Sequence, residues 1–272
     1  MELSKQNGLA AYFDILGFTS IVASDDFDKA VRLVDQVVSV LPKMIDAEIA
    51  RMRGGPSVYR NDTRSIVFAD SILITHSIPA EELLEPFHWY SFLRVCSWLM
   101  SHMLTIGLPI RGAVSFGEFF VKDHCFAGKP IAECHNCSSK TEWAGCVLVP
   151  SIQKIVEGFA PEWNILEQVC VPYGAPFKKE RAEEPAQIQD TPSLVLKWSH
   201  YHPLHPDDKM PNIHESVLKS FRMHGKAGDK LSPDVQLKAD ETVKYLERVN
   251  SLFANSNREM PEHLRRQIFT TS

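Results

Sequence analysis

An apolar run over residues 9–16 opens the pattern of hydrophobic and polar positions, and it ends at Gly17. A short continuous apolar run bounded by a turn residue predicts a buried strand. From 28 to about 52 the apolar residues recur every three or four positions, which predicts a helix that Pro42 interrupts and that the sequence GGP at 54–56 ends. The chain is therefore expected to start with a strand and a long helix.

Two strand-like runs, 57–68 and 71–76, come next, and two residues separate them, the second of which is Asp70. This spacing predicts a β-hairpin with Asp70 at its tip. An apolar and aromatic helix is then expected over 80–106, followed by a strand over 110–120. The first half of the chain thus mixes helices and strands.

The second half is also mixed, with helices expected over 129–145, 151–159 and 232–250 and strands over 146–149 and 193–199. Ser232 is the expected N-cap of the last helix, with Pro233 at its first helical position. Between 172 and 192 the chain is polar and rich in proline, which predicts a loop. The sequence therefore divides into a first domain over 1–171, this loop, and a C-terminal strand with a helical extension over 193–272.

Composition and charge limit the partners that this protein is expected to bind. The 272 residues carry a formal net charge of −5 with a pI near 6.1, and no basic stripe dominates any element. These features argue against nucleic acid or an anionic membrane surface as a partner. No apolar stretch approaches the roughly 18 residues of a membrane span, and the first residues lack a secretion signal, so a cytoplasmic protein is expected.

Six cysteines in a chain of this length fit a reducing compartment. Cys134 and Cys137 form a lone C-x-x-C, but no second half-site completes four zinc ligands. A structural role is therefore favoured for this pair over a metal or redox role.

Two acids, Asp14 and Asp70, stand inside apolar strand sequence. A carboxylate taken out of water needs a cationic, hydrogen-bonding or metal partner. If the first strand pairs antiparallel with the hairpin, both carboxylates project from one end of the sheet, where two like charges favour a bound Mg²⁺ or Mn²⁺. The alternative is local: Asp14 caps the next helix or binds turn amides, and Asp70 is an ordinary hairpin-turn residue.

One stretch resembles a known motif. Residues 12–19, YFDILGFT, are similar to the F-x-D-I-x-G-F-T signature of the class III nucleotidyl cyclases, the adenylyl and guanylyl cyclase family, with Tyr12 in place of the first Phe. Residues 68–73, FADSIL, fall where that family has its second metal-binding Asp, and 110–117, IRGAVSFG, resemble its R-x-G-[IV]-x-x-G strand. The resemblance extends over about residues 9–150.

The resemblance implies an α+β fold, with a ferredoxin-like antiparallel sheet and helices packed on it, in a homodimer whose catalytic domains meet head to tail. In that family the ribose 3′-oxygen attacks the α-phosphate and pyrophosphate leaves. The same roles here would place two Mn²⁺ or Mg²⁺ ions between Asp14, Asp70 and the backbone carbonyl of Ile15. The implied nucleotide-binding residues, including turn amides on the triphosphate, are Phe13, Leu16, Gly17, Phe18, Thr19 and Arg111.

Arg111 also stands inside an apolar strand, where a guanidinium needs an anion. That anion is either a substrate phosphate or the carboxylate of a structural ion pair.

The chain departs from the family at the helix that bears an Asn and, four residues later, an Arg, both of which steady the transition state. Ala132 and Asn136 occupy these two positions, which argues against ordinary purine cyclisation. The side chains that could replace the missing groups are His135, Asn136, Ser139 and Lys140. A plain helix-surface position is the competing interpretation of each.

The residues that read a purine in that family are also replaced, because Ile66 and Cys125 stand in their places. A different base is implied. Residues 128–133 and the WAG at 143–145 resemble a branch of the family, the pyrimidine cyclases of the bacterial antiphage system called Pycsar. This implies conversion of UTP or CTP into 3′,5′-cyclic UMP or CMP, a second messenger that activates a separate effector.

Two alternatives stay open. The first is an adenylyl or guanylyl cyclase with substituted base-reading residues. The second is a catalytically inactive cyclase-like dimer that binds a nucleotide as a sensor.

Overall fold

The structure is a computed structural model that describes residues 5–22, 27–53, 63–122, 125–156, 169–178, 193–198, 212–223 and 230–254. Its strands form one sheet in the order β2-β3-β1-β4-β6-β8-β7, and β5 pairs with β4. The described pairs are antiparallel, apart from the parallel pair β4 and β6. The strands are β1 (Gln6–Ile15), β2 (Thr63–Phe68), β3 (Ser71–Ser77), β4 (Ile110–Lys122), β5 (Cys125–Gly128), β6 (Cys146–Leu148), β7 (Cys170–Tyr173) and β8 (Ser193–Leu196).

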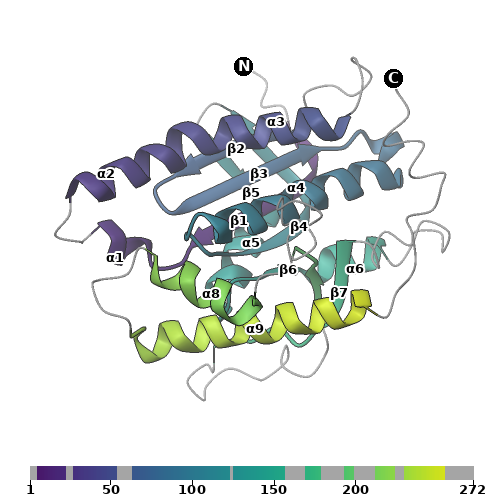
Figure 1. Ribbon diagram of the computed structural model, residues 1–272. Helices are drawn as coiled ribbons and strands as arrows, with labels where there is room; N and C mark the ends of the chain where they lie inside the picture. The colour runs from purple at the N-terminus through teal and green to yellow at the C-terminus, as the bar shows by residue number, and fades with distance from the viewer. Residues whose placement is uncertain are drawn as a thin grey trace, which may run out of the picture.

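Helices cover both sides of this sheet (Figure 1). The expected helix over 28–52 is divided into α2, a π-helical turn (Gln36–Val40) and α3. This turn ends two residues before Pro42, whose missing N–H cannot continue the regular hydrogen-bond ladder. The helices are α1 (Phe18–Val22), α2 (Phe27–Asp35), α3 (Leu41–Arg53), α4 (Pro86–Thr105), α5 (Lys129–Lys140), α6 (Pro150–Val156), α8 (Ile213–Arg222) and α9 (Pro233–Ala254), with a 3-10 turn at Ala80–Glu82.

The first four strands follow the ferredoxin-like plan. A strand, a helical region, a hairpin, a helix and a fourth strand come in this order along the chain, and β1 lies between β3 and β4. The expected α+β class is therefore confirmed, and so is the hairpin with Asp70 in its two-residue turn. The part of the expected strand at 57–62 and the helix end at 157–159 lie outside the described residues.

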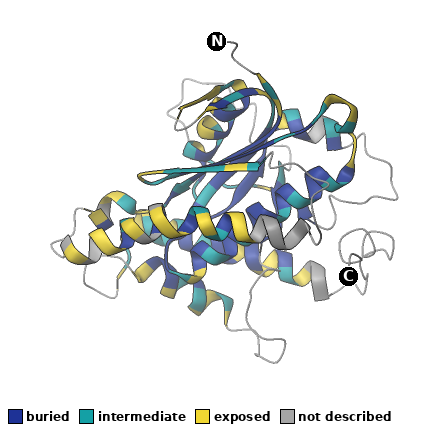
Figure 2. Cartoon of the chain, turned by 90° about the horizontal axis from the view of Figure 1, so that it is seen from above, coloured by how far each residue is buried: buried dark blue, intermediate teal, exposed yellow. Residues whose placement is uncertain are grey.

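The two faces of the sheet have different roles because side chains alternate along each strand. Leu9, Ala11, Phe13 and Ile15 of β1 belong to the main core, which α4 fills with Trp89, Leu93 and Leu99 among others. The intervening residues of β1, among them Tyr12 and Asp14, face the side on which α5 packs. In Figure 2 the strands are mostly buried, whereas the outward turns of the helices are exposed.

The C-terminal elements complete the same sheet and core. β8 joins β6 to β7, and α9 packs its Tyr245 edge-to-face on Trp143, with ring centroids 4.8 Å apart. The Thr242 hydroxyl accepts a 2.9 Å hydrogen bond from the Ala144 amide. α9 begins at Pro233, as the N-cap signal predicted. In the described part of the chain, no helix is long and apolar enough to cross a membrane.

Gly8 marks a close approach of β1 to β3. A Cβ added there would lie 2.0 Å from the His76 carbonyl oxygen, which is a backbone atom and cannot rotate away. We expect Gly8→Ala to lower the free energy of unfolding by about 1–3 kcal/mol, the usual cost of overpacking. Urea unfolding followed by circular dichroism measures this, with Gly174→Ala as the control because nothing lies within 4 Å of its added Cβ. Equal stability of the two variants would contradict the close approach.

Candidate functional site

The two predicted acids lie at the same end of neighbouring strands. Asp14 is paired with Ser71 of β3 on one side and with Arg111 of β4 on the other. The Ile15 amide donates a 2.9 Å hydrogen bond to the backbone carbonyl of Asp70, so the end of β1 is held directly against the hairpin turn. The antiparallel arrangement expected from the sequence therefore brings Asp14, Ile15 and Asp70 together.

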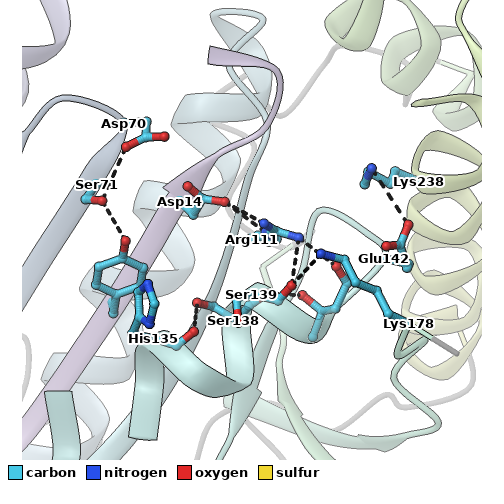
Figure 3. Close-up of polar contacts among 12 residues, drawn as sticks. Asp14, Asp70, Ser71, Arg111, His135, Ser138, Ser139, Glu142, Lys178 and Lys238 are labelled. Carbon is cyan, nitrogen blue, oxygen red and sulfur yellow. Dashed lines mark hydrogen bonds and ion pairs between the residues drawn. The ribbon is translucent and has the colours of Figure 1, made fainter. Parts of the chain in front are cut away.

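Asp14 is held by an ion pair within the sheet. Its Oδ2 atom accepts a 2.9 Å hydrogen bond from Arg111 Nε and lies 2.8 Å from Arg111 Nη2 in the ion pair (Figure 3). The carboxylate of Asp14 therefore neither caps a helix nor binds turn amides, because its partner is the guanidinium of Arg111. Among the described residues, Asp14 Oδ1 makes no hydrogen bond or ion pair, and it stays available to another group.

Arg111 connects the sheet to the C-terminal end of α5. Its Nη1 donates to the carbonyl of Thr141 at 3.0 Å and to that of Ser139 at 3.3 Å. The Ser139 carbonyl also accepts a 2.7 Å hydrogen bond from Lys178 Nζ, so two cationic side chains converge on one oxygen (Figure 3). Cations at the last carbonyls of a helix are stabilised by its dipole.

The sequence did not single out Lys178, since it lies 67 positions beyond Arg111 in a polar stretch. The backbone brings it to the site through an isolated bridge between Thr141 and Phe177 and a 2.7 Å hydrogen bond from the Lys178 amide to the Lys140 carbonyl. Only the tertiary arrangement shows this contact.

Asp70 lies in the turn of the hairpin and is half-buried. Its Oδ1 accepts a 3.4 Å hydrogen bond from the Ser71 hydroxyl, which lies 2.6 Å from the Tyr12 hydroxyl. Tyr12 in turn packs edge-to-face with His135 of α5, with centroids 5.1 Å apart. Among the described residues, Asp70 Oδ2 makes no hydrogen bond or ion pair.

Burial raises the pKa of Asp14 above its ordinary value, while Arg111 acts in the opposite direction and the charge of Asp70 adds to the rise. Burial also raises the pKa of Tyr12. The part of this rise that comes from the charge of Asp70 is the effect that a cation bound between the two carboxylates would remove.

The residues present fit hard divalent cations. Each carboxylate keeps one uncommitted oxygen, and the Ile15 backbone lies against Asp70. Oxygen donors of this kind suit Mg²⁺ and Mn²⁺. No group of three or more His, Cys, Asp or Glu side chains suited to a metal occurs within the described ranges, so any ion here also needs backbone, water or ligand oxygens.

The residues expected to contact nucleotide lie in different parts of the structure, some in the core and some in the turn after β1. Phe13 is fully buried in the main core, on the face opposite to Asp14, so its side chain cannot contact a ligand at the carboxylates.

The Leu16 amide already donates a 2.9 Å hydrogen bond to the Pro109 carbonyl and is not free for a phosphate. Gly17, with φ of 78°, turns the chain into α1, where Phe18 is half-buried and Thr19 is exposed.

The α5 candidates separate along the helix. The exposed positions on the helix are Ala132, His135, Asn136 and Lys140, and the ring of His135 also packs edge-to-face with Tyr12. Ser139 contributes its backbone carbonyl to Arg111 and Lys178, while its hydroxyl donates to the Asn136 carbonyl at 3.1 Å. Of these residues, His135 and Ser139 contact the groups that surround the carboxylates.

Ile66 is half-buried on β2 opposite Leu73, and Cys125 is exposed at the start of β5. Both thiols of the C-x-x-C pair lie in apolar surroundings. Cys134 is fully buried and donates a 3.3 Å hydrogen bond to the Ala10 carbonyl. Burial raises the pKa of Cys137 to about 11. Neither thiol is suited to react or to bind metal as a thiolate.

Comparison with known proteins adds fold similarity alone. No protein-family model matches the chain, and no curated protein matches it. The chain is similar to a crystal structure of the catalytic core of a rhodopsin-guanylyl cyclase with converted specificity in complex with ATPalphaS, at TM-score 0.46 and 12% identity, over 72% of this chain and 98% of that one. It is also similar to a class III adenylyl cyclase-like ATP-binding protein from Pseudomonas aeruginosa, at TM-score 0.41 and 14% identity, over 57% of this chain and 35% of that one.

Proposed function

We propose that this protein is a pyrimidine nucleotide cyclase, which converts UTP or CTP into the 3′,5′-cyclic monophosphate and pyrophosphate. The observation that carries the proposal is the pair of carboxylates, Asp14 and Asp70, at one end of β1 and β3, each with one uncommitted oxygen. Two neighbouring carboxylates that each keep one oxygen free, beside the turn at Gly17, suit the binding of a hard divalent cation.

In this reaction the ribose 3′-oxygen forms a bond to the α-phosphorus, the bond from that phosphorus to pyrophosphate breaks, and the hydroxyl proton leaves. Two divalent ions held by Asp14, Asp70 and the Ile15 carbonyl would lower the pKa of the 3′-hydroxyl and neutralise phosphate charge. Arg111 favours the ionised form of Asp14 and fixes its orientation through one hydrogen bond and an ion pair to the same oxygen.

The missing transition-state groups need a replacement. Arg111 pairs with Asp14, and Lys178 shares the Ser139 carbonyl with Arg111. We assign these two cations this electrostatic role toward phosphate oxygens. Amides from Gly17 onward, at the start of α1, supply further donors to the triphosphate.

The pyrimidine preference rests on Ile66 and Cys125, which replace the polar pair that reads a purine in the class III cyclases that the sequence resembles. A homodimer fits a site in which one chain supplies one catalytic module. In this proposal the cyclic product is a second messenger that activates an effector in antiphage defence.

Two observations favour a second candidate function. Asp14 is already neutralised by Arg111, and Ala132 and Asn136 stand where catalytic groups are expected, which suits a nucleotide-binding sensor without catalysis. An adenylyl or guanylyl cyclase is the remaining alternative.

Incubation of the purified chain with each of the four ribonucleoside triphosphates and Mn²⁺, followed by mass identification of the products, separates these functions. Cyclic UMP or cyclic CMP as the product supports the proposal, and a cyclic purine nucleotide supports the alternative of an adenylyl or guanylyl cyclase. Tight nucleotide binding with no cyclic product supports the sensor.

A further inference from the structure

A hydrogen-bonded chain of three side chains ends on Asp70. Tyr12 Oη lies 2.6 Å from Ser71 Oγ, and Ser71 Oγ donates to Asp70 Oδ1 at 3.4 Å (Figure 3). A serine hydroxyl has one hydrogen, so when that hydrogen points to Asp70, the phenol must donate to Ser71. The chain therefore runs from phenol to hydroxyl to carboxylate.

The position of Asp70 at the tip of the β2–β3 hairpin leaves its side chain free to rotate unless a hydrogen bond holds it. It lies in a two-residue turn beside Ala69, a non-glycine residue with φ of 52°, and its neighbour Phe68 is 75% exposed. A side chain at a hairpin tip has few packing neighbours to fix its rotamer. A metal-binding carboxylate that is free to rotate loses this freedom on binding, and affinity falls accordingly.

The other end of the chain is fixed. Tyr12 lies on β1 between β3 and β4, on the same face as Asp14, and its ring packs edge-to-face against His135 of α5. The motif that residues 12–19 resemble has Phe at this position, so the hydroxyl is a feature of this chain. A phenylalanine would fill the same space but could not donate to Ser71.

We infer that Tyr12 and Ser71 are positioning residues for Asp70, which hold its Oδ1 so that Oδ2 faces a divalent cation. This inference rests on the proposed role of Asp70 as a metal ligand. The arrangement parallels that of Asp14, whose Oδ2 is held by Arg111 while Oδ1 stays free. Each carboxylate thus has one oxygen fixed by a neighbouring side chain and one left for the ion.

Mn²⁺ binding without nucleotide tests this inference, measured by the free-Mn²⁺ signal in electron paramagnetic resonance. Ser71→Ala removes the hydrogen bond to the carboxylate, and Tyr12→Phe removes the donor that orients the Ser71 hydroxyl. We expect each variant to weaken Mn²⁺ binding about 5–10-fold. The double variant should be no weaker than either single one, because both residues act through one chain. Tyr90→Phe is the matched control, since its ring is buried in the main core on α4, and it should bind Mn²⁺ like the wild type.

Each outcome decides a different question. Wild-type Mn²⁺ affinity in Tyr12→Phe, or additive effects in the double variant, overturns the positioning role, while cyclic product from the wild type still supports the proposed function. If the wild type forms no cyclic product but Tyr12→Phe weakens Mn²⁺ binding as expected, the proposed function fails and the positioning role holds. No Mn²⁺ binding by the wild type at millimolar concentration overturns the inference.

Discussion

Replacing Asp70 with Asn should reduce cyclic-nucleotide formation by about 10³-fold or more, because it removes a charged ligand where negative charge develops on phosphate. The fold should persist, since Asp70 is half-buried at a hairpin turn and its side chain accepts a hydrogen bond from the adjacent Ser71. The free energy of unfolding should therefore change by less than about 1 kcal/mol. Product formation measured by mass, together with urea unfolding, checks both statements.

Asp46→Asn is the matched control for this variant. Asp46 is an exposed acid on α3, so its substitution changes the net charge equally without touching the site. It should retain wild-type activity. An Asp70→Asn variant with more than a tenth of wild-type activity would rule out Asp70 as a metal ligand in catalysis.

Arg111→Met should lower the free energy of unfolding by about 2–3 kcal/mol at pH 7, because it leaves Asp14 without its cation. The side chains of Arg111 and Asp14 are 14% and 21% exposed, so water compensates the lost ion pair only in part. The carbonyls of Ser139 and Thr141 also lose a donor at the end of α5. Urea unfolding in metal-free buffer measures the change.

The pH dependence of this variant identifies its cause. Burial already raises the pKa of Asp14, and loss of Arg111 raises it further. The native state then binds more protons than the unfolded state between the two pKa values, so stability falls as pH rises through this range. The deficit of Arg111→Met should therefore be smaller near pH 4 than at pH 7.

The double variant Arg111→Met with Asp14→Asn is the control, because it has no carboxylate to leave unpaired. Its stability should be higher than that of Arg111→Met at pH 7, and its deficit should not depend on the protonation of residue 14. If both variants are equally unstable at every pH, the ion pair is not what Arg111 contributes.

The continuous apolar run that contains Asp14 and ends at Gly17 was sufficient to predict the end of β1. The two-residue gap between two strand-like runs was sufficient to predict the turn that carries Asp70. Local patterns of this kind survive folding because strand periodicity and turn chemistry act over a few residues. The division of the long helix before Pro42 was not predicted in this form. A π-helical turn depends on how the backbone accommodates the missing N–H donor of the proline, which local patterns do not specify.

What the amino-acid order alone determined is the set of local elements and the two acids within them. Only the tertiary structure decided their partners: Arg111 on Asp14, Ser71 and Tyr12 on Asp70, and Lys178 on the Ser139 carbonyl. It also placed Phe13 on the opposite face of the sheet, away from any ligand at the carboxylates. The physical reason is that local periodicity tells which residues share a face, whereas strand register and crossing segments decide which distant residues meet there.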